Sequence, residues 1–240
     1  MVLGTLSSSL LPAQTADELV ARNLLARGGI EKIKALKTLR MTGKVQQGGF
    51  RAQFVRESAA PNFIKQMVTI QGMTEIQAYD GSTGWQISPF EGRKDAELLG
   101  EDELRGLVED ADFYGPLVDY RTKDNRIEYL GLDTVDGDDA YRLRVTLANG
   151  DILYYYLDPD TCLEIRLERV QFIRGSVRET FTNLGSYRQV SGVYFPYSLE
   201  AGSKQNPNFA ARITLDKIEA NVPVDPPAFR MPPASSGTEQ

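Results

Sequence analysis

The sequence predicts an α+β fold, a long antiparallel β-sheet with helices laid over it. Apolar and polar residues alternate with a period of two over most of the chain, which is typical of strands with one wet face. Successive strands are separated by short turns and not by helical crossovers, so neighbouring strands should run antiparallel. Helical periodicity is confined to the start and to one central stretch, which indicates one α+β domain.

The chain is predicted to begin with two helices. Thr15 and Glu18 have the spacing of a capping box, in which each side chain bonds the backbone N–H of the other residue. Gly28 and Gly29 should end this first helix. A shorter helix is predicted over about 30–37.

Five strands are predicted next, at about 38–45, 50–55, 63–71, 73–80 and 84–88. The strand at 63–71 is apolar on both faces, so it should be covered on both. The run Tyr79–Trp85 contains the turn formers Asp80 and Gly81 and the only tryptophan of the protein. This run predicts a hairpin that delivers Trp85 to the interior side of the sheet.

An acidic, helical insertion is predicted between about 95 and 120. Its apolar positions recur at i, i+3, i+4 and i+7, namely Leu104, Leu107, Val108 and Ala111. A helix with such a stripe should lie on the sheet.

Six further strands are predicted, at about 141–147, 152–157, 163–167, 176–187, 192–200 and 209–219. Asn149 and Gly150 are a strong signal for a two-residue hairpin turn between the first two of them. The total is therefore about eleven strands.

Composition argues against several function classes. The chain has no histidine, so it lacks the commonest general base and every Ser-His or Cys-His arrangement. The net charge of −6 and the lack of a dense Lys/Arg cluster argue against nucleic acid as a partner. The single cysteine, Cys162, lies in a strand pattern and is interpreted as a small buried hydrophobe rather than a reactive thiol.

Two groups of carboxylates leave alternatives open. Glu109, Asp110 and Asp112 fit an acid pair or a metal site, but such a run is more often the solvated face of a helix. The aspartates between 133 and 139 do not match a calcium-binding loop and fit a polar hairpin turn better. We therefore predict no metal and no cofactor, and keep a hydrolase using Glu109 and Asp112 as a minor alternative.

The domain boundaries follow from the two ends of the chain. Residues 2–13 resemble the apolar tail of a secretory signal, although the basic front end is missing. We predict a signal-peptide remnant or disordered segment over 1–14, one domain over 15–232 and a flexible tail over 233–240. The sequence is thus expected to belong to an exported protein.

Six short motifs are spread along the chain in a fixed order. They are Gly28-Gly29 after the opening helix, TLRMTG at 38–43, YDGSTGW at 79–85, YYLDPDT at 155–161, YRQVSGVYFP at 187–196, and NVPVD at 221–225 with Phe229 and Pro232. Each motif alone is only turn chemistry, but their order resembles the bacterial outer-membrane lipoprotein-sorting and lipoprotein-carrier proteins, the LolA/LolB-like superfamily.

The resemblance implies a strongly curved half-barrel with an apolar hollow covered by helices. It implies a soluble periplasmic carrier without a catalytic motif, whose partners are a lipid or an acylated lipoprotein and membrane-bound donor and acceptor proteins. The alternative is an envelope sensor or protein-interaction module on the same scaffold, which moves no lipid.

The candidate ligand-binding residues are apolar or aromatic side chains expected to line the hollow. They are Met67, Ile70, Met73, Ile76, Trp85, Leu107, Phe113, Leu117, Tyr154, Tyr156, Phe181 and Phe195. The alternative for each of them is an ordinary place in a packed core.

Overall fold

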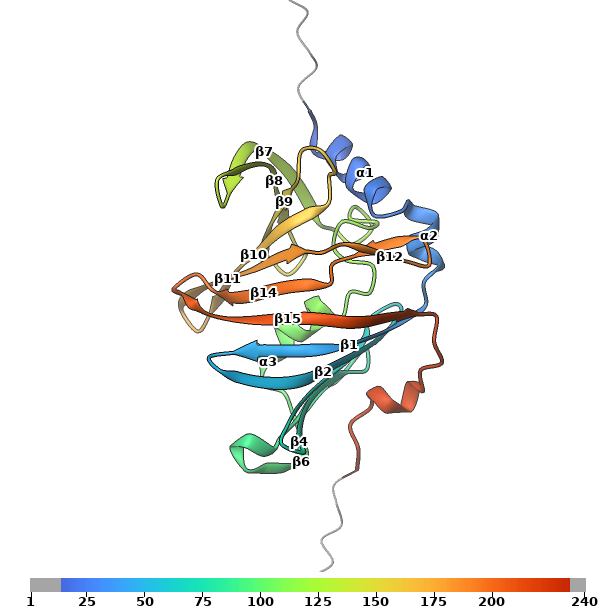
Figure 1. Ribbon diagram of the computed structural model, residues 1–240, viewed down its shortest axis with the longest axis vertical. Coiled ribbons are helices and arrows are strands. Elements are labelled where there is room, and N and C mark those ends of the chain that lie inside the picture. The colour runs from blue at the N-terminus through green and yellow to red at the C-terminus, as the bar shows by residue number, and fades with distance from the viewer. Residues whose placement is uncertain (1–13, 234–240) are drawn as a thin grey trace, which may run out of the picture.

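One antiparallel sheet of 13 strands forms the body of the protein (Figure 1). The computed structural model describes residues 14–233, so the predicted terminal segments 1–14 and 233–240 lie outside it apart from their innermost residues. The helices are α1 (Ala16–Ala26), α2 (Ile30–Ala35) and α3 (Glu101–Asp110), with short 3-10 turns η1 (Pro89–Glu91) and η2 (Pro226–Phe229).

The strands follow one another along the chain in two series, before and after α3. The first series is β1 (Thr38–Gln47), β2 (Phe50–Ala59), β3 (Phe63–Ile70), β4 (Met73–Tyr79), β5 (Gly84–Ser88) and β6 (Arg93–Leu98). The second is β7 (Arg126–Val135), β8 (Asp138–Thr146), β9 (Ile152–Leu157), β10 (Glu164–Ile173), β11 (Ser176–Gly185), β12 (Arg188–Val190), β13 (Val193–Phe195), β14 (Ser198–Ser203) and β15 (Asn206–Ala220).

The spatial order is β6-β5-β4-β3-β2-β1-β15-β14-β11-β10-β9-β8-β7, and β12 and β13 pair separately. Strands β6 and β7 are the two edges, so the sheet does not close. Figure 1 shows it curving around α3, which lies behind the central strands β15 and β1. The predicted fold class, a curved antiparallel half-barrel with helices, is confirmed.

Pairing of β1 with β15 joins the two series into one sheet. At Gly43 the register of this pair shifts, and a Cβ added there would lie 2.2 Å from the backbone oxygen of Thr214. The strand can therefore pass this bulge only with glycine at position 43.

The local predictions for the first helix and the β4–β5 hairpin are confirmed. Thr15 Oγ1 accepts from the backbone N–H of Glu18 at 3.2 Å, and the backbone N–H of Thr15 donates to the Glu18 carboxylate at 2.9 Å. In the β4–β5 turn, Asp80 Oδ1 accepts from the backbone of Thr83 at 2.7 Å. The β8–β9 hairpin lies at the predicted place, but its loop has three residues, 148–150, and not two: the backbone N–H of Leu147 donates to the backbone oxygen of Asp151 at 2.9 Å, and Gly150 has a positive φ.

Both faces of β3 are covered, also as predicted. On one face Ile64 packs with Leu107 of α3. On the other face Phe63 lies against Phe229 of the C-terminal segment, with ring centroids 5.6 Å apart. The C-terminal segment therefore acts as a second cover, on the convex side of the sheet.

Three strands were not predicted, namely β6, β7 and the short β12. The helical insertion predicted from about 95 begins only at Glu101, because residues 93–98 pair with β5 as strand β6. Strand β7 was not predicted, because a register shift between Tyr129 and Leu132 interrupts the period of two along it. The strand predicted at 192–200 is split by Pro196, which cannot donate to a neighbouring strand.

None of the helices within residues 14–233 combines the length and apolar character needed to cross a membrane.

Candidate ligand-binding cavity

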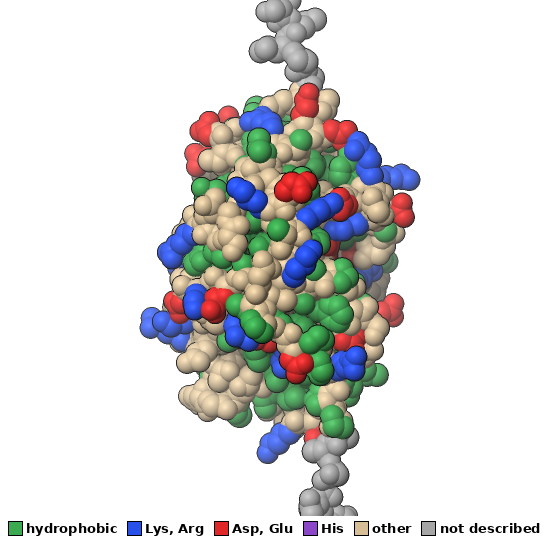
Figure 2. All heavy atoms as spheres, turned by 90° about the vertical axis from the view of Figure 1, so that its right-hand side faces the viewer, with side chains coloured by type: hydrophobic (Ala, Val, Ile, Leu, Met, Phe, Trp, Pro, Cys, Tyr) green, Lys and Arg blue, Asp and Glu red, His purple; other side chains and the backbone are tan. Residues whose placement is uncertain are grey.

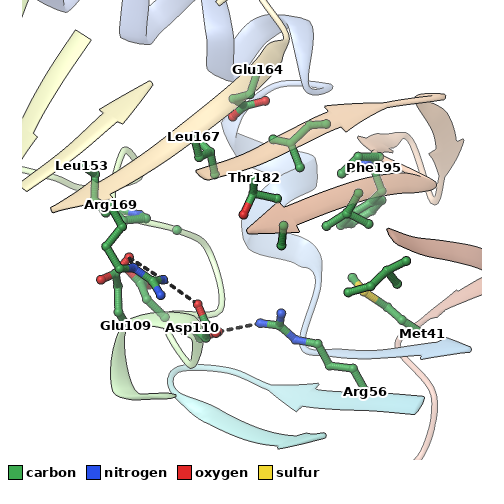
Figure 3. A pocket seen from close by; sticks show the side chains of 18 of the residues that line it. Met41, Arg56, Glu109, Asp110, Leu153, Glu164, Leu167, Arg169, Thr182 and Phe195 are labelled. Carbon is green, nitrogen blue, oxygen red and sulfur yellow. Dashed lines mark hydrogen bonds and ion pairs between the residues drawn. The ribbon is translucent and has the colours of Figure 1, made fainter. Parts of the chain in front are cut away.

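The concave face of the sheet encloses a cavity of about 680 Å³ (Figure 3). Its walls come mainly from β1, β2, β9, β10, β11, β14 and β15, and α3 with residues 111–117 covers it. This volume lies in the range typical of sites for small organic ligands.

Most of the lining side chains are apolar. They are Leu39, Met41, Phe54, Phe113, Leu117, Leu153, Tyr155, Leu167, Phe181, Leu184, Phe195, Leu199, Ile213 and Leu215. Residues two apart share one face of a strand, so Leu39 and Met41 face the cavity together. Leu153 and Tyr155 do the same from β9.

The covering segment, residues 111–117, is held to the rest of the protein by polar contacts. The backbone N–H of Phe113 donates to the backbone oxygen of Pro61 at 3.1 Å. Lys123 binds the Asp112 carboxylate at 2.6 Å. The cavity is therefore closed on this side by a loop and not by a strand.

A cluster of charged side chains, which we call the ionic cluster, joins opposite walls of the cavity at the last turn of α3 (Figure 3). Arg169 of β10 binds Glu109 Oε1 at 2.8 Å and Asp110 Oδ1 at 2.8 Å. From the opposite wall, Arg56 of β2 donates to the backbone oxygen of Asp110 at 2.6 Å. The end of α3 is thus tied to both halves of the sheet.

Burial dominates the electrostatics of this ionic cluster. It raises the pKa of Glu109 from 4.5 to about 7, against the lowering effect of Arg169, and the neighbouring Asp110 carboxylate raises it further. Glu109 Oε2 has no hydrogen-bond partner. Burial also lowers the pKa of Arg56.

The Glu109 carboxyl gives the protein a predicted pH dependence. Its pKa is higher folded than unfolded, so the native state binds more protons between about pH 4.5 and pH 7, and stability falls as pH rises through this window. We expect the stability of wild type relative to Glu109→Gln to fall by about 2–3 kcal/mol from pH 5 to pH 8. Urea unfolding at both pH values measures this difference.

Glu101→Gln, at the exposed first position of α3, is the matched control and should leave the pH dependence as in wild type. Equal pH dependence of wild type and Glu109→Gln would contradict a raised pKa at Glu109.

A second polar group lies on the wall near the end of α1. The Tyr187 hydroxyl donates to the backbone oxygen of Glu164 at 2.7 Å, and burial raises its pKa. Arg27 lies 4.0 Å from the Glu164 carboxylate. The cavity is therefore apolar in the middle and polar at two places on its boundary.

Solved structures share this fold. A LolA superfamily protein from Nitrosomonas europaea matches with a TM-score of 0.61 at 11% identity, over 91% of this chain and 98% of that one. A putative outer membrane lipoprotein-sorting protein domain from Vibrio parahaemolyticus matches with a TM-score of 0.58 at 10% identity, over 88% and 97%. A DUF1329 family protein from Desulfovibrio piger matches with a TM-score of 0.51 at 12% identity, over 91% and 98%.

The chain has a LolA-like fold. No protein-family model matches the sequence, and no curated protein does. The similarity is therefore one of structure, and identities this low establish the fold alone.

Four of the twelve predicted ligand-binding residues belong to the cavity wall, namely Phe113, Leu117, Phe181 and Phe195. Phe113 and Leu117 reach it from the covering segment. Phe195 reaches it from β13, as Figure 3 shows. Phe181 differs from the other three, because it pairs with Glu168 and its side chain lies on the face of β11 opposite Thr182, under the Arg166 guanidinium, which is 4.7 Å from the ring centroid.

The first-series residues predicted for the site lie outside the cavity lining. Trp85 pairs with Ala78 on the convex face, where its indole N–H donates to the backbone oxygen of Phe229 at 2.7 Å. Met67 and Ile76 are directly opposite each other on β3 and β4, and Ile76 lies on the same convex face as Ala78, two residues further along β4. Trp85 thus reaches a buried place, but on the face of the sheet away from the cavity.

Ile70 and Met73 pair beside the β3–β4 turn, and Met73 is largely exposed. Leu107 is on the face of α3 that packs against Ile64 and Tyr79. These three residues also lie away from the cavity lining.

Tyr154 and Tyr156 face the convex side, because Tyr155 between them faces the cavity. The Arg142 guanidinium lies 4.4 Å from the Tyr154 ring centroid and 5.5 Å from that of Tyr156. The sequence showed that the three tyrosines alternate, but not which face would be concave.

The polar residues of the cavity were missed as site residues. Arg56 and Arg169 stand in the apolar register of their strands, two residues after Phe54 and Leu167, which also face the cavity. A charged residue in an otherwise apolar register is the signal that could have found them. Their place becomes clear only once α3 lies across the sheet.

The two carboxylates considered as a catalytic pair have separate partners: Glu109 pairs with Arg169, and Asp112 pairs with Lys123. The Asp136-Gly137 pair forms the predicted polar hairpin turn, with positive φ at both residues. Among residues 14–233, no three His, Cys, Asp or Glu side chains are grouped to hold a metal ion.

Proposed function

We propose that this protein is an exported periplasmic carrier that binds a lipid, or the acyl chain of a lipidated protein, in the cavity. The observation that carries the proposal is the cavity itself, about 680 Å³ bounded mostly by aliphatic and aromatic side chains. The covering segment and α3 supply a boundary that a guest could enter without unfolding the sheet.

The hydrophobic effect supplies the affinity that such a carrier needs. Each buried methylene is worth about 0.8 kcal/mol, so a long acyl chain brings on the order of 10 kcal/mol before the costs of association. No covalent chemistry is required. The protein's task would be to keep apolar chains out of water while they cross an aqueous space, with membrane-bound donor and acceptor proteins as its partners.

The test fills the cavity from within. Thr182 of β11 lines the cavity and is visible in Figure 3, whereas Asn183 is the next residue along the strand and points to the opposite face. We expect Thr182→Trp to weaken binding of a fluorescent long-chain fatty acid at least tenfold. Asn183→Trp, the matched control, should bind as wild type does.

Native mass spectrometry of the purified wild type gives the second readout. Bound lipid in wild type and its loss in Thr182→Trp support the carrier. Equal fatty-acid affinity in both tryptophan variants, or a wild type that takes up no lipid from vesicles, would overturn the proposal. Circular dichroism checks that both variants are folded.

A further inference from the structure

Six hairpin turns emerge next to one another at one end of the sheet. Five of them carry exposed apolar side chains and join, in spatial order, β5 to β6, β3 to β4, β1 to β2, β14 to β15, and β10 to β11, while the sixth joins β8 to β9. Because every pair is antiparallel, all six turns emerge at the same end. The β1–β2 and β14–β15 turns are seen on the left of Figure 1.

Each of the five hairpins from β5–β6 to β10–β11 exposes a large apolar side chain within or beside its turn. We call these residues the apolar rim: Phe50, Met73, Phe90, Phe172, Val177 and Phe209. They are half of the twelve large hydrophobic side chains that are exposed within residues 14–233. Scattered exposed hydrophobics are normal, but such a concentration at one end marks an interaction surface.

Three phenylalanines dominate the rim. Phe50 is 72% exposed, Phe172 65% and Phe209 58%. Phe209 lies over the β1–β2 turn, close to Gly48. Phe172 pairs directly with Val177 across the β10–β11 hairpin, so this tip presents two apolar side chains together.

The charge of the same five turns is opposite to that of the whole molecule. Residues 47–51, 70–74, 88–94, 172–178 and 203–209 contain six Lys or Arg residues and one acidic residue, Glu91. The chain as a whole has a net charge of −6. Three of these six residues pair with carboxylates elsewhere, namely Arg93 with Glu97, Arg174 with Asp102 and Lys204 with Glu168. The rim is therefore an apolar end with a small local excess of Lys and Arg on an acidic protein.

We propose that the apolar rim docks the protein onto the surface of an anionic lipid bilayer. Aromatic side chains that enter the boundary between headgroups and acyl chains, flanked by Lys and Arg, are the combination that binds such surfaces. Neighbouring hairpins are two strands apart, about 10 Å, so the rim residues stand on separate tips. Separate tips can enter a fluid lipid interface individually, and the proposal requires no ligand in the cavity.

Vesicle co-sedimentation of the full chain tests this docking. The probes are vesicles of pure phosphatidylcholine and vesicles in which about 30% of the lipid is anionic phosphatidylglycerol. The anionic lipid gives the second kind of vesicle a negative surface potential. We expect wild type to bind the anionic vesicles. The triple variant Phe50→Ser, Phe172→Ser, Phe209→Ser should bind at least tenfold more weakly.

The matched control removes equally exposed apolar side chains elsewhere. Leu25→Ser on α1 and Leu132→Ser on β7 change residues that are 74% and 61% exposed. Together they should leave vesicle binding unchanged. Residues 1–13 are identical in all variants, so any difference reports the changed side chains alone.

Removing charge from the rim gives an independent readout. Arg51→Gln with Arg178→Gln should weaken binding to anionic vesicles by about fivefold for each arginine removed, the equivalent of about 1 kcal/mol. A rim triple variant that binds like wild type would overturn the proposal. The proposal would also be overturned if wild type bound no vesicles but self-associated, and the triple variant did not self-associate. The rim would then be a contact between copies of the protein.

Discussion

Arg169→Met should destabilise the protein by about 3–5 kcal/mol at pH 8, because it leaves two carboxylates near the cavity without their shared cation. Glu109 and Asp110 both bind the Arg169 guanidinium, and the Glu109 side chain is only 8% exposed. The loss should be smaller at pH 5, where Glu109 is protonated and needs no cation. Urea denaturation at the two pH values measures both effects.

Arg174→Met is the matched control for this change. Arg174 also binds a carboxylate of α3, Asp102, at 2.6 Å, but its side chain is 80% exposed. Its removal should cost no more than about 1 kcal/mol. The double variant Arg169→Met, Glu109→Gln should recover part of the loss at pH 8. Equal effects of Arg169→Met and Arg174→Met would show that the ionic cluster does not hold α3.

Phe229→Ala should cost about 3–5 kcal/mol, the usual loss when a fully buried phenylalanine is truncated. Phe229 is 1% exposed and packs on Phe63, while its backbone oxygen accepts the Trp85 indole N–H. The only tryptophan of the protein is thus a reporter for the C-terminal cover. Its fluorescence emission should shift to longer wavelength as water reaches the indole.

Phe209→Ala provides the control for the truncation, because Phe209 is 58% exposed. It should change stability by no more than about 0.5 kcal/mol and leave the Trp85 emission unchanged. An unshifted emission in Phe229→Ala would mean that the C-terminal segment stays docked on the convex face without its phenylalanine.

Local structure was predictable because it depends on neighbours in the sequence. The capping box at Thr15 needs only a residue three positions away. The β4–β5 turn needs only Asp80 to accept backbone N–H groups within three residues. Strand β7 was missed because a bulge between Tyr129 and Leu132 interrupts its period of two, and this bulge is set by the pairing with β8.

The site was predicted less well, because each strand has two faces and the sequence does not say which is concave. Alternation placed Tyr155 opposite Tyr154 and Tyr156, and the structure keeps that alternation but turns Tyr155 toward the cavity. Trp85 was expected inside, and it is buried, but under Phe229 on the convex side. Large aromatic residues favour any dry place equally, so their type cannot choose between the two covers of the sheet.

The sequence by itself determined the strand and turn pattern, the antiparallel α+β architecture and the apolar character of the interior. These follow from side-chain periodicity and turn chemistry, which act over a few residues. Only the tertiary structure decided which face became the cavity, that Arg56 and Arg169 meet at the end of α3, and that five hairpins place their apolar tips at one end. Those features arise from pairing between distant strands, such as β1 with β15, and no local pattern encodes the partner.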